Sequence, residues 1–135
     1  MLEHLLNAGR QVTLCATDDA HFSEPDHFGG WVMVRAPENT PEALLAALKD
    51  GAFYSSTGPE LHDVVWGETG VEIACSAAVT AVLQGKGSRT SVKHGYSMSR
   101  IRLPYGQLAS SPWLRLTIID AAGKRAWTNP VWRNT

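Results

Sequence analysis

Asp19 and His21 stand two residues apart, directly after a short apolar stretch at residues 11–16. At the end of a strand, alternate residues can point the same way, so a carboxylate and an imidazole at this spacing can converge on one cation. This spacing makes Asp19 and His21 candidate ligands of a divalent metal. Two protein ligands do not complete a site, because zinc generally takes three or four and a paired-metal hydrolytic site takes more. The alternative is a solvated polar loop in which Asp18 and Asp19 form caps or turns.

Three further side chains are candidates for accessory roles beside this pair, and no residue is assigned as catalytic. Asp18 precedes the pair, and its role stays open. His27 is either an extra ligand or a solvent-facing loop residue. Arg35 directly follows a second apolar stretch; its guanidinium either reaches a substrate phosphate or forms an ordinary salt bridge.

Two strands must deliver these side chains. Residues 11–16 are apolar and β-prone with polar residues following at once, which predicts a buried strand that brings residues 17–22 to a surface. Residues 31–35 predict a second short strand. Residues 1–8 carry leucines at helical spacing and end before Gly9, which indicates the last turns of a helix.

A second helix is predicted from Thr40 to Gly51. Thr40 can cap the free N–H groups, Pro41 suits the first helical position, and Gly51 ends the helix. Its expected buried stripe consists of Leu44, Leu45 and Leu48.

From Ala52 onward the pattern changes to short β-rich runs separated by Gly, Pro, Asn and Ser, which is typical of a sandwich or barrel. Alternation in residues 114–119 predicts a half-exposed strand, and residues 120–124 predict a tight hairpin with Gly123 at positive φ. We expect an α+β, mainly β protein, with an α/β part at residues 1–51 and an antiparallel β-sandwich-like domain at residues 52–135. The expected strands are residues 53–57, 61–66, 71–76, 78–83, 97–103, 113–120 and 125–132.

Composition narrows the class of protein. The chain has 135 residues, and 12 Lys and Arg against 13 Asp and Glu give a net charge of -1, which argues against nucleic acid as a partner. No signal peptide or membrane-spanning run is evident, so we expect a cytoplasmic protein without a membrane partner. Cys15 and Cys75 are expected to be small buried thiols, and the five tryptophans are expected to pack in the core and sheet.

An ordered set of motifs resembles a known family. In chain order these are C-A-T-D-D-A-H at 15–21, G-G-W at 29–31, V-R-A-P-E at 34–38, the helix at 40–51, F-Y-S-S-T-G-P at 53–59, D-A-A-G at 120–123 and A-W-T-N-P-V-W at 126–132. Together they resemble the C-terminal end of the PHP (polymerase and histidinol phosphatase) superfamily, and most of all its CehA/McbA-like metallohydrolase branch.

This resemblance implies a metal-dependent phosphoesterase with a distorted β/α barrel, of which residues 1–51 would be the C-terminal remnant. Divalent metals, Zn, Mn or Fe, would be held by a His-x-His near the N-terminus, by ligands in the middle and by a late Asp-x-His. Asp19 and His21 stand at the last of these positions; the family commonly has Ser or Gly where Asp18 stands. No His-x-His occurs in this sequence, so the site is expected to be incomplete and the chain inactive alone.

Three hypotheses follow for the function. The chain is part of a phosphoesterase acting on a phosphorylated small molecule; or it is a non-catalytic β-sandwich binding module; or, compatibly with the second, it is a homo-oligomer. The third follows because a barrel lacking most of its strands would expose apolar faces.

Overall fold

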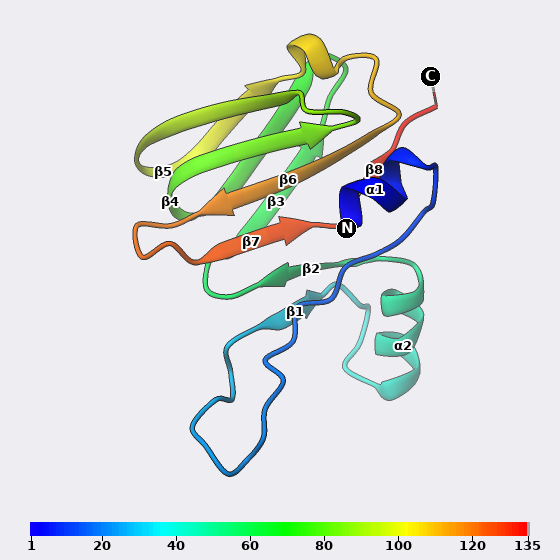
Figure 1. The fold of residues 1–135 in the computed structure, drawn as a ribbon. Helices are drawn as coiled ribbons and strands as arrows, with labels where there is room; N and C mark the ends of the chain where they lie inside the picture. Colours follow the sequence, from blue (N-terminus) through cyan, green and yellow to red (C-terminus); the bar gives the residue numbers. More distant parts are fainter. Residues whose placement is uncertain (135) are drawn as a thin grey trace.

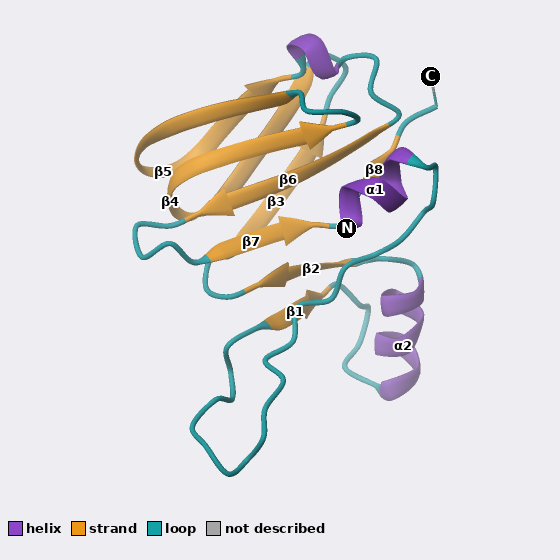
Figure 2. Cartoon of the chain, viewed as in Figure 1, coloured by secondary structure: helices purple, strands orange, loops and turns teal. Residues whose placement is uncertain are grey.

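The computed structural model describes residues 1–134, and within them the fold is mainly β, as expected from the sequence (Figures 1 and 2). Eight strands, two α-helices and one 3-10 helix follow one another along this part of the chain. Their bounds are α1 Leu2–Asn7, β1 Trp31–Val34, α2 Pro41–Lys49, β2 Phe53–Ser56, β3 Leu61–Trp66, β4 Gly70–Gly85, β5 Thr90–Pro104, η1 Gly106–Leu108, β6 Trp113–Ile119, β7 Arg125–Thr128 and β8 Val131–Trp132.

All the strands belong to one antiparallel sheet that curls on itself through β4. The first half of β4 pairs with β3 and its second half pairs with β6, while β5 pairs along nearly the whole of β4. The β4–β5 register shifts between Ala74 and Thr80, and such irregularities bend a strand and strengthen its twist. The two strands predicted at residues 71–76 and 78–83 are thus one continuous strand, β4, which bends between them.

The core lies inside the curl. Val71 and Leu103 on one side and Leu83, Leu116 and Ile118 on the other have at most 1% of their surface exposed. Burying each of these side chains stabilises the fold by about 1.5–3 kcal/mol relative to exposure. The curled sheet confirms the mainly β, sandwich-like class.

Strand β6 is buried on both faces, so the predicted half-exposed strand was wrong. Arg115 and Thr117, expected on an open face, are only 9% and 6% exposed. Helix α1 lies over this face: Leu6 is 1% exposed, and Arg115 Nη2 donates to Glu3 Oε1 at 3.1 Å (Figure 1). Alternation in a strand reports which residues share a face, and it does not report whether a distant helix covers that face.

Residues 11–16 do not form the strand that the sequence predicts. Every second side chain, from Val12 to Ala16, is half-buried, as in a strand, yet no backbone–backbone hydrogen bond ties these residues to another strand in the described chain. Side chains hold them instead. Leu14 N–H donates to Asn129 Oδ1 at 2.9 Å, and Ala16 N–H donates to Ser55 Oγ at 3.0 Å. The β pattern gives an extended backbone, but a strand also needs a neighbouring backbone to pair with.

Helix α2 forms as predicted except for its buried stripe. Thr40 Oγ1 accepts from Ala43 N–H, Pro41 is the first helical residue, and Gly51 has φ of +71°. Leu45 is 52% exposed, whereas Ala47 is buried. Helix α2 lies beside the edge of the sheet formed by β1, so most of its residues are exposed (Figure 2).

The strands at the end of the chain differ in detail from the prediction. The hairpin between β6 and β7 is confirmed, with Gly123 at φ of +78°. The predicted strand at residues 125–132 is interrupted before β8 because Pro130 has no N–H to donate to a ladder. Cys75 is buried as expected, but Cys15 is exposed because residues 11–16 are covered on one side only.

The sheet continues across the predicted domain boundary. Strand β2 pairs with β1 on one edge and with β7 on the other, so residues on both sides of position 51 share one sheet. The division at residues 51 and 52, and the derivation of residues 1–51 from a PHP barrel, stay predictions.

Candidate functional site

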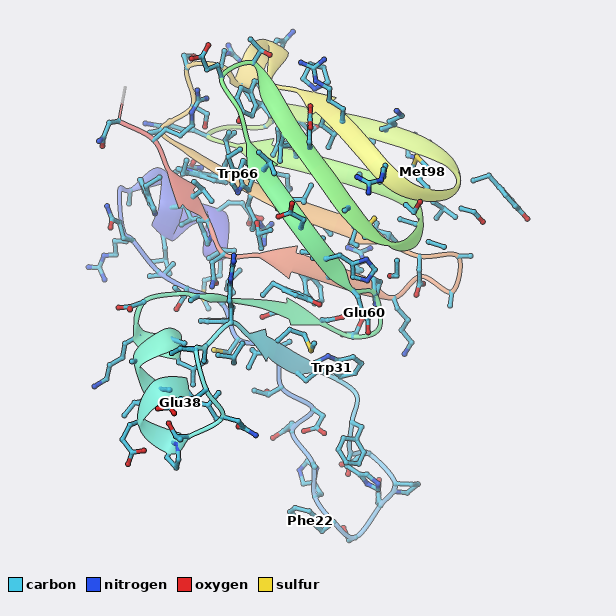
Figure 3. The ribbon with its side chains drawn as sticks, turned by 180° about the vertical axis from the view of Figure 1, so that it is seen from behind. Phe22, Trp31, Glu38, Glu60, Trp66 and Met98 are labelled. Atoms are coloured by element: carbon cyan, nitrogen blue, oxygen red, sulfur yellow. The ribbon has the colours of Figure 1, made fainter. Side chains whose placement is uncertain are left out.

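The predicted ligand pair lies on a long loop, residues 17–30, which we call the Asp-x-His loop. It connects the extended residues 11–16 to β1 and extends away from the sheet (Figure 1). Phe22 lies at its far end and Trp31 lies where the chain returns to the sheet (Figure 3).

The neck of this loop is closed by close backbone approach. A Cβ at Gly30 would lie 3.0 Å from the carbonyl oxygen of Thr17, so only glycine fits here without a shift. Asp18 Oδ2 accepts a hydrogen bond from Phe28 N–H across the same neck. Asp18 therefore helps to close the neck of the loop through a bond that spans ten residues, and its role beside a metal stays a prediction.

Three residues of the loop adopt left-handed backbone angles. The φ values are +53° at Asp19, +57° at Phe22 and +63° at Phe28. Such angles cost roughly 1–3 kcal/mol in a residue other than glycine and persist only where surrounding contacts hold them. The loop is therefore a shaped segment whose hydrogen bonds determine its form.

His21 and Asp26 form the central contact of the loop. His21 Nδ1 lies 2.8 Å from Asp26 Oδ2, and His21 N–H donates to Oδ1 and Oδ2 at 3.1 and 3.2 Å. These bonds, first that from the backbone N–H and then that from the ring, lower the pKa of Asp26. The side chains are 65% and 33% exposed.

The donors of the loop fit a divalent metal in kind and fall short in number. Asp19 supplies a carboxylate and His21 an imidazole, both ordinary ligands of zinc and similar ions. Within residues 1–134, however, no three His, Cys, Asp or Glu side chains are grouped so that they could hold a metal ion. The pair can contribute to a site but does not form one.

The structure does not bring the other two accessory candidates to this pair. His27 packs edge-on against Phe28, with ring centroids 5.1 Å apart at 73°, and its side chain is exposed. Arg35 follows the end of β1 that is remote from the loop, where its N–H donates to the carbonyl of Ala52. The length of β1 thus separates Arg35 from Asp19 and His21.

Arg35 instead lines an open groove of about 690 Å³, which the sequence did not indicate. The groove lies where the curled sheet brings β3 toward β1 and β2, strands that stand far apart in the strand order. His62 Nε2 pairs with Glu60 Oε2 at 3.1 Å on its rim, and burial raises the pKa of Tyr54 in its wall. The lining residues are Met33, Val34, Arg35, Ala52, Phe53, Tyr54, Glu60, Leu61, His62, Asp63, Val64 and Thr128.

Strands β2 and β3, which both line this groove, are connected by a turn at residues 56–59. Ser56 Oγ donates to the carbonyl of Pro59 and accepts from Gly58 N–H, which makes it a tight turn. The groove itself results from the curl of the sheet, and a pattern of short strands does not report which strands come to face each other.

Comparison with known proteins adds no relative. No family model, curated protein or solved structure matches the chain. Among the helices of residues 1–134, none has the length and apolar character needed to cross a membrane.

Proposed function

We propose that the chain is the C-terminal portion of a PHP-type metal-dependent phosphoesterase and that it contributes Asp19 and His21 to the metal site. Alone, it is incomplete as an enzyme. The observation that carries the proposal is the His21–Asp26 contact, because a metal-ligating histidine almost always donates its other ring N–H to a carboxylate, a backbone carbonyl or water.

The extended residues 11–16 support the same proposal. Their alternating exposure is that of a strand, while their backbone groups bond to the side chains of Ser55 and Asn129 rather than to a ladder. A strand of a larger sheet that lacks its neighbours would have this form. In open α/β sheets and barrels, sites lie at the carboxyl ends of strands, which is where the Asp-x-His loop begins.

In the proposed enzyme a bound divalent metal would supply an activated water and stabilise phosphoryl oxygens. The described residues would contribute one carboxylate and one imidazole, and the remaining ligands would come from outside them. Hydrolysis is therefore expected only when those ligands are supplied.

Metal binding by the purified chain tests the proposal. Titration with Mn²⁺ or Zn²⁺ in a calorimeter should show weak binding that Asp19→Ala and His21→Ala each abolish. His62→Ala is the matched control, because His62 is also an exposed histidine paired with a carboxylate but lies on β3. Binding that is lost equally in the control, or that survives both loop substitutions, would contradict the proposal.

The second candidate is a non-catalytic β-sandwich binding module, and the observation that favours it is the groove between β3 and the β1–β2 pair. Arg35 offers that groove a guanidinium for an anionic group. Titration with phosphorylated small molecules such as glycerol phosphate, followed by NMR, should then shift the amides of Arg35 and His62 and leave the Asp-x-His loop unchanged. Light scattering on the same sample measures whether the module self-associates.

A further inference from the structure

We propose that Asp26 is a positioning residue for His21: it holds the proton of the neutral imidazole on Nδ1 and so presents the lone pair of Nε2 as the metal-ligating atom. This inference deepens the proposed function and rests on it for the identity of the ligand. The assignment of the proton itself rests only on the geometry of the metal-free loop.

The contact is unusually well defined for an exposed pair. Asp26 bonds to His21 in two ways: the backbone N–H of His21 is shared between both carboxylate oxygens, and the ring bonds to Oδ2. The backbone contacts fix the carboxylate relative to the main chain of His21, so the ring nitrogen meets an acceptor that is already in place. At 2.8 Å, the separation of Nδ1 and Oδ2 is that of a charge-assisted hydrogen bond.

This geometry selects one tautomer. A neutral imidazole carries one N–H, and a carboxylate only accepts, so a hydrogen bond between Nδ1 and Asp26 requires the proton on Nδ1. Nε2 then carries the lone pair. In metal sites the same arrangement orients the ring and raises its basicity toward the metal.

The chain contains an opposite case that serves as an internal comparison. His62 meets its carboxylate partner Glu60 through Nε2, at 3.1 Å, so the same reasoning places its proton on Nε2. Both side chains of that pair are more than half exposed; His62 lies on β3, and Glu60 immediately precedes that strand. Two exposed His–carboxylate pairs in one protein should therefore show opposite tautomers.

Among the described residues, the ring of His21 has no second hydrogen bond that would otherwise set the position of its proton. Its side chain is 65% exposed, and both its ring and its backbone N–H bond to Asp26. His27, six residues along, packs on Phe28 instead. A substitution at Asp26 should thus change His21 without a competing partner.

Nitrogen NMR of the imidazole rings tests the inference on the metal-free protein at pH 8, where histidine side chains are generally neutral. Long-range ¹H–¹⁵N spectra should show the Nδ1–H form for His21 and the Nε2–H form for His62. Asp26→Ala should convert His21 toward the Nε2–H form that predominates in free histidine, whereas Asp26→Asn, which keeps an acceptor oxygen, should retain much of the Nδ1–H form. Glu60→Ala is the matched control and should leave His21 unchanged.

Affinity for Zn²⁺ gives the second measurement. Asp26→Ala is expected to weaken binding by about 10- to 100-fold, which is the usual loss when the partner of a ligating histidine is removed. An Nε2–H tautomer at His21 in the unmodified chain, or no change of tautomer in Asp26→Ala, would overturn the inference. If the tautomer behaves as stated but Zn²⁺ does not bind, the positioning role stands and the proposed metal function fails.

Discussion

Ser55 replaces a missing strand partner for residues 11–16, and Ser55→Ala should release them. Its hydroxyl donates to the carbonyl of Leu14 at 2.7 Å and accepts from Ala16 N–H at 3.0 Å, while Ser55 itself is only 3% exposed. Each such bond contributes about 0.5–1.5 kcal/mol net. Two such bonds together contribute about 1–3 kcal/mol. Because Leu14 and Ala16 are half-buried, water can replace part of the lost bonding, so we expect the free energy of local opening of residues 11–16 to fall by about 1–2 kcal/mol.

The loss should be local, because the sheet does not depend on this segment for its ladder. Native-state hydrogen exchange followed by NMR is the appropriate assay. Ala16 N–H should exchange roughly 5- to 30-fold faster in Ser55→Ala, the factor that corresponds to 1–2 kcal/mol. Leu14 N–H, whose acceptor is Asn129, should be affected less, and amides in β6 should keep their protection.

The control is Ser99→Ala, which removes an exposed hydroxyl from β5. It should leave the exchange of Ala16 unchanged. The reasoning would be refuted by an unchanged Ala16 rate in Ser55→Ala, or by equal acceleration of amides throughout the sheet, since either result would mean that the hydroxyl does not tie this segment specifically.

Two further predictions concern the core and the thiols. Leu116→Ala should lower the free energy of unfolding by about 2–5 kcal/mol in urea titrations, because Leu116 is fully buried and its removal leaves a cavity, whereas Val65→Ala on the exposed surface should cost far less. In native protein a thiol reagent should label Cys15 quickly and Cys75 only after unfolding, and Cys15→Ser should abolish the fast phase. Rapid labelling of two thiols would contradict the burial of Cys75. Burial raises the pKa of Cys75, so the contribution of this thiol to the free energy of unfolding should be full below the unfolded thiol pKa of about 8.5 and should decline as pH rises toward the higher folded value. Cys75→Ala should flatten that decline.

Local signals in the sequence predicted the parts of the fold that local physics decides. Thr40, Pro41 and Gly51 determine where α2 begins and ends through capping and backbone angles, which involve only neighbouring residues. The hairpin at Gly123 follows from turn chemistry in the same way. Both were predicted correctly for that reason.

The errors concern partners that are distant in sequence. Residues 11–16 have the composition of a strand, but the groups beside them are the side chains of Ser55 and Asn129. Arg115 stands at an outward position of β6 and is buried because α1 covers it. Neither neighbour is visible in a periodic pattern, which records one segment at a time.

In the candidate site, too, the sequence indicated the local feature and missed the contacts that depend on the fold. The Asp-x-His spacing indicated a ligand pair, and the structure adds that Asp26 bonds to His21 and that Arg35 lies elsewhere. Asp26 was visible in the sequence only as one of several nearby acids. Its role depends on how the loop turns back at residues with left-handed angles, which residue types alone do not specify.

The contact between Glu3 and Arg115 has a consequence for how the chain folds during synthesis. The two residues are 112 positions apart, and Leu14 and Asn129 are 115 apart. At about 5–20 residues per second, a ribosome needs on the order of 10 s to make the later partner after the earlier one has emerged. An isolated six-residue helix is not stable in water, so α1 must wait unfolded until β6 exists. Residues 2–7 are therefore made well before β6 but are secured only after it, and a nascent chain stalled before Trp113 should present Leu2, Leu5 and Leu6 to chaperones.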